Sequence, residues 1–435
     1  MTEPGSTEPG STEPGSGAAA GDAPGGGTGE PPGPTPPVVR LGALGFERGA
    51  HLLVQRALRD LRPGQELAVA GDDPLLPVHL RAWCREQGHR VRIPGPGEHW
   101  GDGIRARVVR GRADLDRWAG AVRAGGPGPD GLVARPPAAW GLAARGALVE
   151  DGGPAGPFDL ADRDHVWADV APALYARAAA EQWDPARAVD WDAGFTLPGE
   201  VERAVVQVMT YLVENEQAAL VVPARLLARI HPHFREVQQL LAVQAADEAR
   251  HMEVFTRRAL LRGGELGTSS AGGRESLHTL LTEPDFSLAS FLLSVLGEGS
   301  FLSLLGFLER HAPDPVTRRI TALARRDEAR HVAFGVAHLH HRGTLDPALR
   351  GRLRAAVERR HDALVDTAGL NQDVFDSLVV LAAGEWTPRA VGRGHEAVLR
   401  LQAEMDEGRQ RRLLHLGFPA DEAAELSALH TRNFM

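Results

Sequence analysis

The pentad Asp-Glu-Ala-Arg-His occupies residues 247–251 and is repeated without change at residues 327–331, eighty residues further along the chain. Each copy lies inside a long segment with the apolar spacing of a helix. A glutamate and a histidine three positions apart lie on one face of a helix. Each helix can therefore direct one carboxylate and one imidazole toward a single point, and two such helices facing each other would supply two of each.

An acidic residue in an apolar helical segment precedes each pentad. Glu298, in SVLGEGSFLSLLGF, stands thirty residues before the second pentad's glutamate, and Glu216, in YLVENEQAALVV, stands thirty-two before the first. Glu214 competes with Glu216, which we favour because its spacing is closer to that of the second half. A two-metal site needs bridging oxygen ligands, and we expect these upstream glutamates to supply them. The predicted metal ligands, which are also the predicted catalytic residues, are Glu216, Glu248, His251, Glu298, Glu328 and His331.

This pattern favours a mostly helical fold with a ferritin-like four-helix bundle and extra helices. In such bundles two helices each provide a glutamate, and two others each provide a Glu-x-x-His pair. A single Glu-x-x-His on a helix is usually only a solvated pair. Two identical pentads, each preceded by a lone glutamate in an apolar helix, need another explanation, because four inward-facing carboxylates are costly to bury without a compensating metal.

The doubled motif resembles the ferritin-like non-haem di-iron oxygenases and oxidases, the bacterial multicomponent monooxygenase hydroxylases in particular, over about residues 199–343. The resemblance implies that Asp247 and Asp327 accept hydrogen bonds from metal-bound histidines, and that Arg250 and Arg330 belong to the surrounding network. A ligating imidazole normally donates its other N–H to a carboxylate, which agrees with that role.

The departures from individual subfamilies are informative. Phe255 stands where radical-type ribonucleotide reductase subunits have a tyrosine, and Leu302 stands where the multicomponent hydroxylases have a threonine. Ala324 replaces the third histidine of the arylamine oxygenases. What remains is a stand-alone di-iron oxygenase or oxidase.

The predicted function is oxidation of a small organic substrate, of a biosynthetic kind, by O2. It implies two iron ions, with manganese as the alternative, and an external electron donor. Two other classes stay open. One is a peroxide- or metal-handling protein of the rubrerythrin, ferroxidase or manganese-catalase type, and the other is a non-catalytic scaffold that binds a partner.

Composition and spacing divide the chain into four parts. Residues 1–37, with TEPGS three times over, are predicted to be a disordered tail. We expect a small α+β domain over 38–112, a Gly- and Pro-rich linker over 113–160, and the helical di-metal domain over 161–435. The helices expected in the last part are about 163–182, 199–229, 234–262, 286–310, 314–342, 346–367, 371–384, 388–414 and 420–430.

The α+β segment has its own resemblance. Residues 42–91, GALGFERGAHLLVQRALRDLRPGQELAVAGDDPLLPVHLRAWCREQGHRV, are similar to the TusA-like sulfur-carrier proteins in their order of helices and strands. The family's Cys-Pro-x-Pro motif is replaced by Arg-Gly-Ala-His at 48–51, so the nucleophile is missing. Cys84, in the second helix, is expected to pack in the core. The domain is thus expected to dock or to shape a site, without carrying sulfur.

Other features exclude whole classes of function. Lysine is absent, which excludes a lysine Schiff base and a P-loop lysine. The net charge is −9, of which five negative charges precede the first arginine, leaving about −4 for the rest; no basic face for nucleic acid is predicted. We expect no membrane span, no signal peptide and, from the single cysteine, a cytoplasmic location. A homodimer is the default expectation for oligomeric state.

Overall fold

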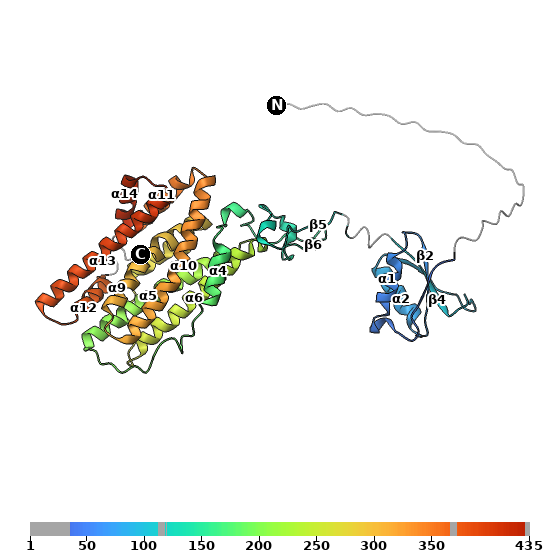
Figure 1. Cartoon of the computed structure of the whole chain (residues 1–435), viewed down its shortest axis with the longest axis horizontal. Helices are drawn as coiled ribbons and strands as arrows, with labels where there is room; N and C mark the ends of the chain where they lie inside the picture. The colour runs from blue at the N-terminus through green and yellow to red at the C-terminus, as the bar shows by residue number, and fades with distance from the viewer. Residues whose placement is uncertain (1–34, 112–117, 119, 366–371, 431–435) are drawn as a thin grey trace, which may run out of the picture. The chain divides into compact units, whose positions relative to one another are not determined.

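The computed structural model describes residues 35–111, 118, 120–365 and 372–430. The chain divides into two compact units, Met1–Arg117 and Trp118–Met435, each of which is described by itself (Figure 1). The tail predicted to be disordered, residues 1–37, lies outside the described residues except for its last three positions.

The N-terminal unit is a small α+β structure with a mixed four-stranded sheet. The sheet order is β1-β2-β4-β3, with β1 parallel to β2, and with β4 antiparallel to both β2 and β3. Helix α1 buries Ala50, Val54 and Leu58, which are four residues apart and share one helix face. In chain order the elements are β1 Val38–Arg40, η1 Phe46–Arg48, α1 Ala50–Arg59, β2 Glu66–Ala70, α2 Leu76–Glu86, β3 Arg90–Arg92 and β4 Ile104–Val109. The expected α+β architecture is confirmed.

The second unit is mostly helical, as predicted, and its central helices are long. They are α4 Ala171–Ala180, α5 Gly199–Leu227, α6 Arg235–Leu260, α7 Ala271–Leu281, α8 Phe286–Ser290, the π-helix η6 Phe291–Glu298, α9 Gly299–His311 and α10 Pro315–Leu345. The C-terminal helices are α11 Leu349–Leu364, α12 Gln372–Ala383, α13 Pro388–His415 and α14 Ala420–His430. Short 3-10 turns, η4 Arg163–His165 and η5 Pro232–Phe234, precede α4 and α6.

Four of these segments form the central bundle. Helix α5 packs along α6, and α10 packs along α9 and η6, while α6 also contacts α10 (Figure 1). Helix α4 covers α6 and α10, α12 lies against α5, and α13 lies against α9 and η6. The elements that carry the two pentads, α6 and α10, are therefore neighbours in the centre of the unit.

Three local differences from the expected helices have identifiable causes. Helix α4 begins eight residues later than predicted, because residues 163–165 form a separate 3-10 turn and Pro172 opens the helix. Helix α7 was not predicted, since two glycines near its start weaken the helical pattern. It is capped by Ser270, whose hydroxyl accepts from the Gly273 N–H at 2.9 Å. The single helix predicted over 286–310 contains the π-helix η6 in its middle.

Residues 120–160, assigned to a linker by composition, pack with the helical unit. They contain η2 Pro129–Gly131, η3 Ala138–Trp140 and a two-stranded sheet of β5 Val122–Arg123 and β6 Leu148–Val149. The buried Arg145 guanidinium donates to the buried Glu236 carboxylate of α6, at 2.9 Å for Nη1 to Oε2. The Val133 N–H donates to His233 Nε2 at 2.9 Å. These polar contacts attach residues 120–160 to the helical unit, although the composition of this segment predicts a linker.

One helical stretch, Phe286–His311, is long and apolar enough to cross a membrane by length and composition, with a mean hydropathy of 1.8. Its most apolar window is 89% buried inside the helical unit. That burial is what the core helix of a bundle requires.

The Arg145–Glu236 pair gives a stability prediction. Arg145→Ala removes both side-chain hydrogen bonds to a buried carboxylate and leaves only Arg235, whose Nε lies 3.6 Å from Glu236 Oε1, so we expect the free energy of unfolding to fall by about 3 kcal/mol. Arg135 pairs with Asp162 through a side chain that is 81% exposed, and Arg135→Ala is expected to change stability by less than about 1 kcal/mol. Urea unfolding followed by tryptophan fluorescence measures both variants. Equal effects of the two substitutions would contradict this anchoring role.

Candidate metal centre

The six predicted ligands meet in the middle of the helical unit. Glu216 projects from α5, Glu248 and His251 from α6, Glu298 from the last position of η6, and Glu328 and His331 from α10. All six are buried, and the most exposed of them, Glu298, retains only 5% of its accessible surface. Glu214, the alternative to Glu216, is only half-buried and lies outside the cluster.

The cluster divides into two overlapping ligand groups. Glu216 and His251 belong to one group, Glu298 and His331 belong to the other, and Glu248 and Glu328 belong to both. Within each group the ligand atoms lie within 4.8 Å of one another. This geometry corrects the expectation that the upstream glutamates bridge. The glutamates of the pentads are shared, because α6 and α10 face each other across the centre, and each upstream glutamate serves one group.

Both imidazoles present Nδ1 to the carboxylates. His251 Nδ1 lies 2.9 Å from Glu248 Oε2, 3.4 Å from Glu328 Oε1 and 3.5 Å from Glu216 Oε2. His331 Nδ1 lies 3.0 Å from Glu248 Oε1 and 3.3 Å from Glu328 Oε2. The same ring atom of each histidine thus points into the centre of the cluster.

The opposite ring nitrogens face aspartates in a crossed arrangement. His251 Nε2 lies 3.3 Å from Asp327 Oδ2, and His331 Nε2 lies 3.2 Å from Asp247 Oδ2. The aspartate of each pentad therefore accepts from the histidine of the other. Burial alone would raise the pKa of Asp327, but the hydrogen bond from His251 and its charge hold that pKa well below the ordinary value. An ionised aspartate on Nε2 leaves the Nδ1 lone pair free for a metal.

The two pentad arginines neutralise these aspartates. Arg330 Nη2 donates to Asp327 Oδ1 at 2.6 Å and to Asp247 Oδ2 at 3.3 Å. Arg250 donates to Asp247, and its Nη2 also lies 3.6 Å from Asp327 Oδ2. Each arginine therefore contacts both aspartates, in agreement with the network role that the resemblance implied.

Residues just beyond α4 complete this network and were not predicted. Trp183 Nε1 donates to Asp327 Oδ2 at 2.7 Å, and its ring lies nearly parallel to that of His251, at 17° and 6.4 Å between centroids. Gln182 Nε2 donates to Asp247 Oδ1 at 3.1 Å. On α6, Gln244 Nε2 donates to Glu298 Oε1 at 3.0 Å. Gln182 and Trp183 belong to a short Glu-Gln-Trp run at the end of a helix, which has no periodic pattern that could predict a role in the site. Its position beside the cluster follows from the tertiary fold.

The fit of the cluster to metal ions can be judged from its unpartnered atoms. The buried atoms without a hydrogen bond include Glu216 Oε1, both Glu248 oxygens, His251 Nδ1, Glu298 Oε2 and Glu328 Oε1. Burial and the neighbouring carboxylates raise the pKa of Glu216 well above its usual value, and the pKa of Glu298 is raised in the same way. Such atoms are costly to leave unsatisfied, whereas two divalent cations would balance four carboxylates. The residues present fit a two-metal centre.

The helical unit therefore has the arrangement of ferritin-like di-metal carboxylate bundles, with one glutamate from each of two segments and Glu-x-x-His from each of two others. No protein-family model and no curated protein matches the chain.

Solved structures match the chain only distantly. A protein with aldehyde deformylating oxidase activity from Synechococcus matches 53% of this chain and 96% of its own, at 20% identity and a TM-score of 0.39. An R2-like ligand-binding oxidase from Sulfolobus acidocaldarius matches 55% of this chain and 91% of its own, at 17% identity and a TM-score of 0.39. A variant R2-like ligand-binding oxidase with an Fe/Fe cofactor matches 56% and 92%, at 19% identity and a TM-score of 0.45. The side chains of the cluster themselves define which ions the centre can bind.

Other polar clusters do not join the centre. His338, from the histidine-rich run after the second pentad, is buried, with its ring nitrogens 2.9 Å from Ser287 Oγ and 3.0 Å from the Trp167 carbonyl. Glu47, Asp73 and His79 of the N-terminal unit lie close together near the protein surface, where such groups are common without a metal.

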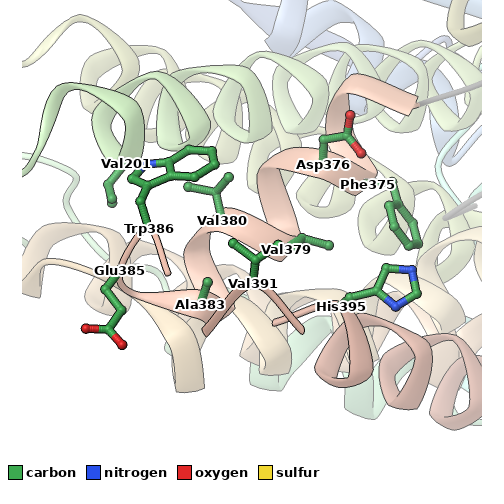
Figure 2. Close-up of a pocket in the computed structure, with 10 residues that line it drawn as sticks. All are labelled: Val201, Phe375, Asp376, Val379, Val380, Ala383, Glu385, Trp386, Val391 and His395. Atoms are coloured by element: carbon green, nitrogen blue, oxygen red, sulfur yellow. The ribbon is translucent and has the colours of Figure 1, made fainter. Parts of the chain in front are cut away.

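A surface pocket of about 360 Å³ lies between the start of α5, α12 and the start of α13. Figure 2 shows Trp386, Val380 and Val201 along one side of it and His395 beside Phe375. None of the six candidate ligands lines this pocket, so it is separate from the carboxylate cluster.

The overlapping groups predict a characteristic metal stoichiometry. We expect the wild-type chain to bind two divalent ions, and Glu248→Ala to lose both, because Glu248 serves both groups. Glu216→Ala is expected to retain about one ion, since only one group loses a ligand. Glu214→Ala, two positions away and outside the cluster, is the matched control and should retain two. Metal analysis after desalting measures all four proteins.

Loss of one ion from the Glu214 variant would move the site assignment to Glu214. Full occupancy of the Glu248 variant would reject the shared-ligand geometry altogether.

Proposed function

We propose that this protein is a non-haem di-iron oxygenase or oxidase that uses O2 to oxidise a small organic substrate. The observation that carries the proposal is that two buried ligand groups share Glu248 and Glu328. A carboxylate-rich set with one imidazole per ion suits a hard, redox-active metal such as iron, or manganese in its place. Zinc in structural sites favours closed tetrahedral sets of Cys and His, and the chain's one cysteine, Cys84, lies in the other unit.

Two bound iron ions would supply redox equivalents and Lewis acidity for the activation of O2. The protein's own contribution is positional. Asp247 and Asp327 each face the Nε2 of an imidazole, a contact that would favour the tautomer whose Nδ1 can bind a metal, and Gln244 orients one oxygen of Glu298. Because every ligand is buried, bulk water is kept from the reacting centre, which strengthens the electrostatic interactions there.

The π-helix η6 gives Glu298 a different backbone setting from the other ligands. Residues Phe291–Glu298 form the wider π turn, a conformation that is often found at functional sites. The flanking Gly297 and Gly299 add no side chain that would crowd this carboxylate. We propose that the wide turn brings the Glu298 carboxylate to its ion.

The proposed reaction also requires partners outside the chain. An oxygenase or oxidase of this kind takes electrons from an external donor and binds a small-molecule substrate near the ions. We propose a cytoplasmic location, in keeping with the single buried cysteine.

We propose that the small α+β N-terminal unit serves for docking, because Arg-Gly-Ala-His at 48–51 replaces the nucleophile motif of the sulfur carriers that its sequence resembles. Its cysteine is unsuited to sulfur transfer. Cys84 is fully buried in α2, and burial raises the pKa of its thiol to about 12. A thiol with so high a pKa has almost no thiolate at neutral pH, and the thiolate is the reactive form.

The decisive experiment for the function is oxygen exposure of the iron-loaded protein. The chain is loaded anaerobically with two equivalents of ferrous ion, mixed with O2, and followed by optical and Mössbauer spectroscopy. We expect both ions to oxidise together within one turnover, because they share two ligands. Glu328→Ala should abolish this coupled oxidation. Retention of the wild-type behaviour by that variant would contradict the proposal.

The same preparation separates the two other classes of function. Rapid turnover of hydrogen peroxide, or continuous oxidation of excess ferrous ion without an organic substrate, would instead support a peroxide- or metal-handling protein. Absence of bound metal would support a scaffold.

A labelling experiment tests the role of Cys84. We expect no reaction of the native chain with iodoacetamide at pH 8, because the thiol is buried and protonated, and complete reaction in 6 M guanidinium chloride, about the strength that unfolds even very stable proteins. Mass spectrometry measures both states. Rapid labelling of the native protein would show a reactive thiol and reopen a sulfur-transfer role.

A further inference from the structure

Two arginines of α13 are buried against the segment that carries Glu298. Arg409 is fully buried and Arg412, one turn later, is mostly shielded from solvent. Arg411 lies between them in sequence, but its side chain is 73% exposed. The guanidinium groups of Arg409 and Arg412 therefore lie on the face of α13 that packs against η6 and α9.

Arg412 occupies the space beside Gly299, the residue that follows Glu298. Its Nε donates to the Val295 carbonyl of η6 at 2.6 Å. A Cβ added at Gly299 would lie 2.5 Å from both Cζ and Nε of Arg412 and 2.8 Å from Nη2. The absence of a side chain at position 299 is thus what admits the guanidinium to the backbone of the π-helix.

Arg409 reaches the same turn through a hydroxyl group. Its Nη1 donates to Ser300 Oγ at 3.2 Å, and Ser300 Oγ donates to the Leu296 carbonyl at 2.7 Å. Helix α13 therefore contacts two successive carbonyl groups of η6, one directly and one through Ser300.

Neither guanidinium has a carboxylate within ion-pair distance among the described residues. Burial lowers the pKa of Arg409 and of Arg412 to about 10, so both remain charged at neutral pH. Arg409 Nη2 and Arg412 Nη2 have no hydrogen-bond partner. Burying unpaired charge is costly, and an ordinary packing role would be filled better by an apolar side chain.

The position of the Glu298 carboxylate depends on the backbone of the π-helix η6. Its carboxylate accepts from Gln244 through Oε1, whereas Oε2 has no partner. A π turn is rarely a stable choice for an isolated helix, so its shape depends on groups that contact it from outside. Arg412 is such a group, and it contacts the turn three residues before Glu298.

We propose that Arg412 is a positioning residue for Glu298, which holds the π turn through the Val295 carbonyl in the space that Gly299 leaves open. The proposal rests on the two-metal function proposed above. It predicts an effect on one ion only, the ion of Glu298 and His331, because the ligands Glu216 and His251 come from α5 and α6.

The test is a titration of the full-length protein with Mn(II), in which electron paramagnetic resonance measures the free ion. Arg412→Ala is expected to weaken one of the two binding steps by about tenfold or more, the usual effect of losing a group that orients a ligand, and to leave the other step within about twofold. Arg412→Lys keeps the charge and a donor, and should restore part of the loss. Arg411→Ala is the matched control and should bind as the wild type does.

A second route to the same disruption keeps the arginine. Gly299→Ala places a methyl group where the guanidinium lies, so it should displace Arg412 and weaken the same step. The double variant Gly299→Ala/Arg412→Ala should then be no weaker than either single variant, because both remove one contact. This route remains informative if Arg412→Ala folds poorly.

Three outcomes overturn the proposal. Unchanged binding in both Arg412→Ala and Gly299→Ala would show that the contact does not position Glu298. Equal weakening of both steps, with a lowered Tm, would indicate a general structural role. Additive losses in the double variant would show that the two residues act separately. Failure of the wild-type chain to bind Mn(II) or Fe(II) would instead reject the two-metal function itself, and the positioning role with it.

Discussion

Four carboxylates are buried together at the centre of the helical bundle, and the rest of the helical unit is arranged around that electrostatic constraint. Like charges in a low-dielectric interior repel strongly. The imidazoles of His251 and His331 lie among the carboxylate oxygens, yet several of those oxygens lack a hydrogen bond. A protein that only needed a stable core would have apolar side chains there. The cluster is therefore a cost in stability that bound cations would offset.

The residues in the layer around the cluster are polar, and their charges form ion pairs, whereas the carboxylates within the cluster repel one another. Asp247 and Asp327 are each met by a histidine from the opposite pentad and by both pentad arginines. Trp183 closes this layer next to His251 with one further hydrogen bond. Hydrogen-bonded and ion-paired networks of this kind hold side chains in one geometry. The carboxylate oxygens that lack a hydrogen bond lie inside this layer, where metal ligation would use them.

The residues that meet in the centre could be found from sequence because their signals are periodic or isolated. The pentads repeat on helical faces, and Glu298 is the one acid in an apolar run. The assignment of bridging ligands could not be found in this way, since it depends on which helices face each other. Gln182 lies 65 positions from its partner Asp247, and Trp183 lies 144 positions from its partner Asp327, so no local sequence pattern reveals these contacts. The π turn, α7 and the packing of residues 120–160 depend on tertiary contacts that local propensity does not encode.

The aspartate–histidine pairs are crossed, so the aspartate and the histidine of one pentad are close in sequence but do not pair with each other in the candidate metal centre. Asp247 is four residues before His251, but the histidine that it contacts is His331 on α10, in the ligand group of Glu298. A substitution of Asp247 would therefore act first on the ion of the second ligand group, to which His331 belongs. Each pentad helix thus depends on the other, because the aspartate that orients each histidine comes from the opposite helix.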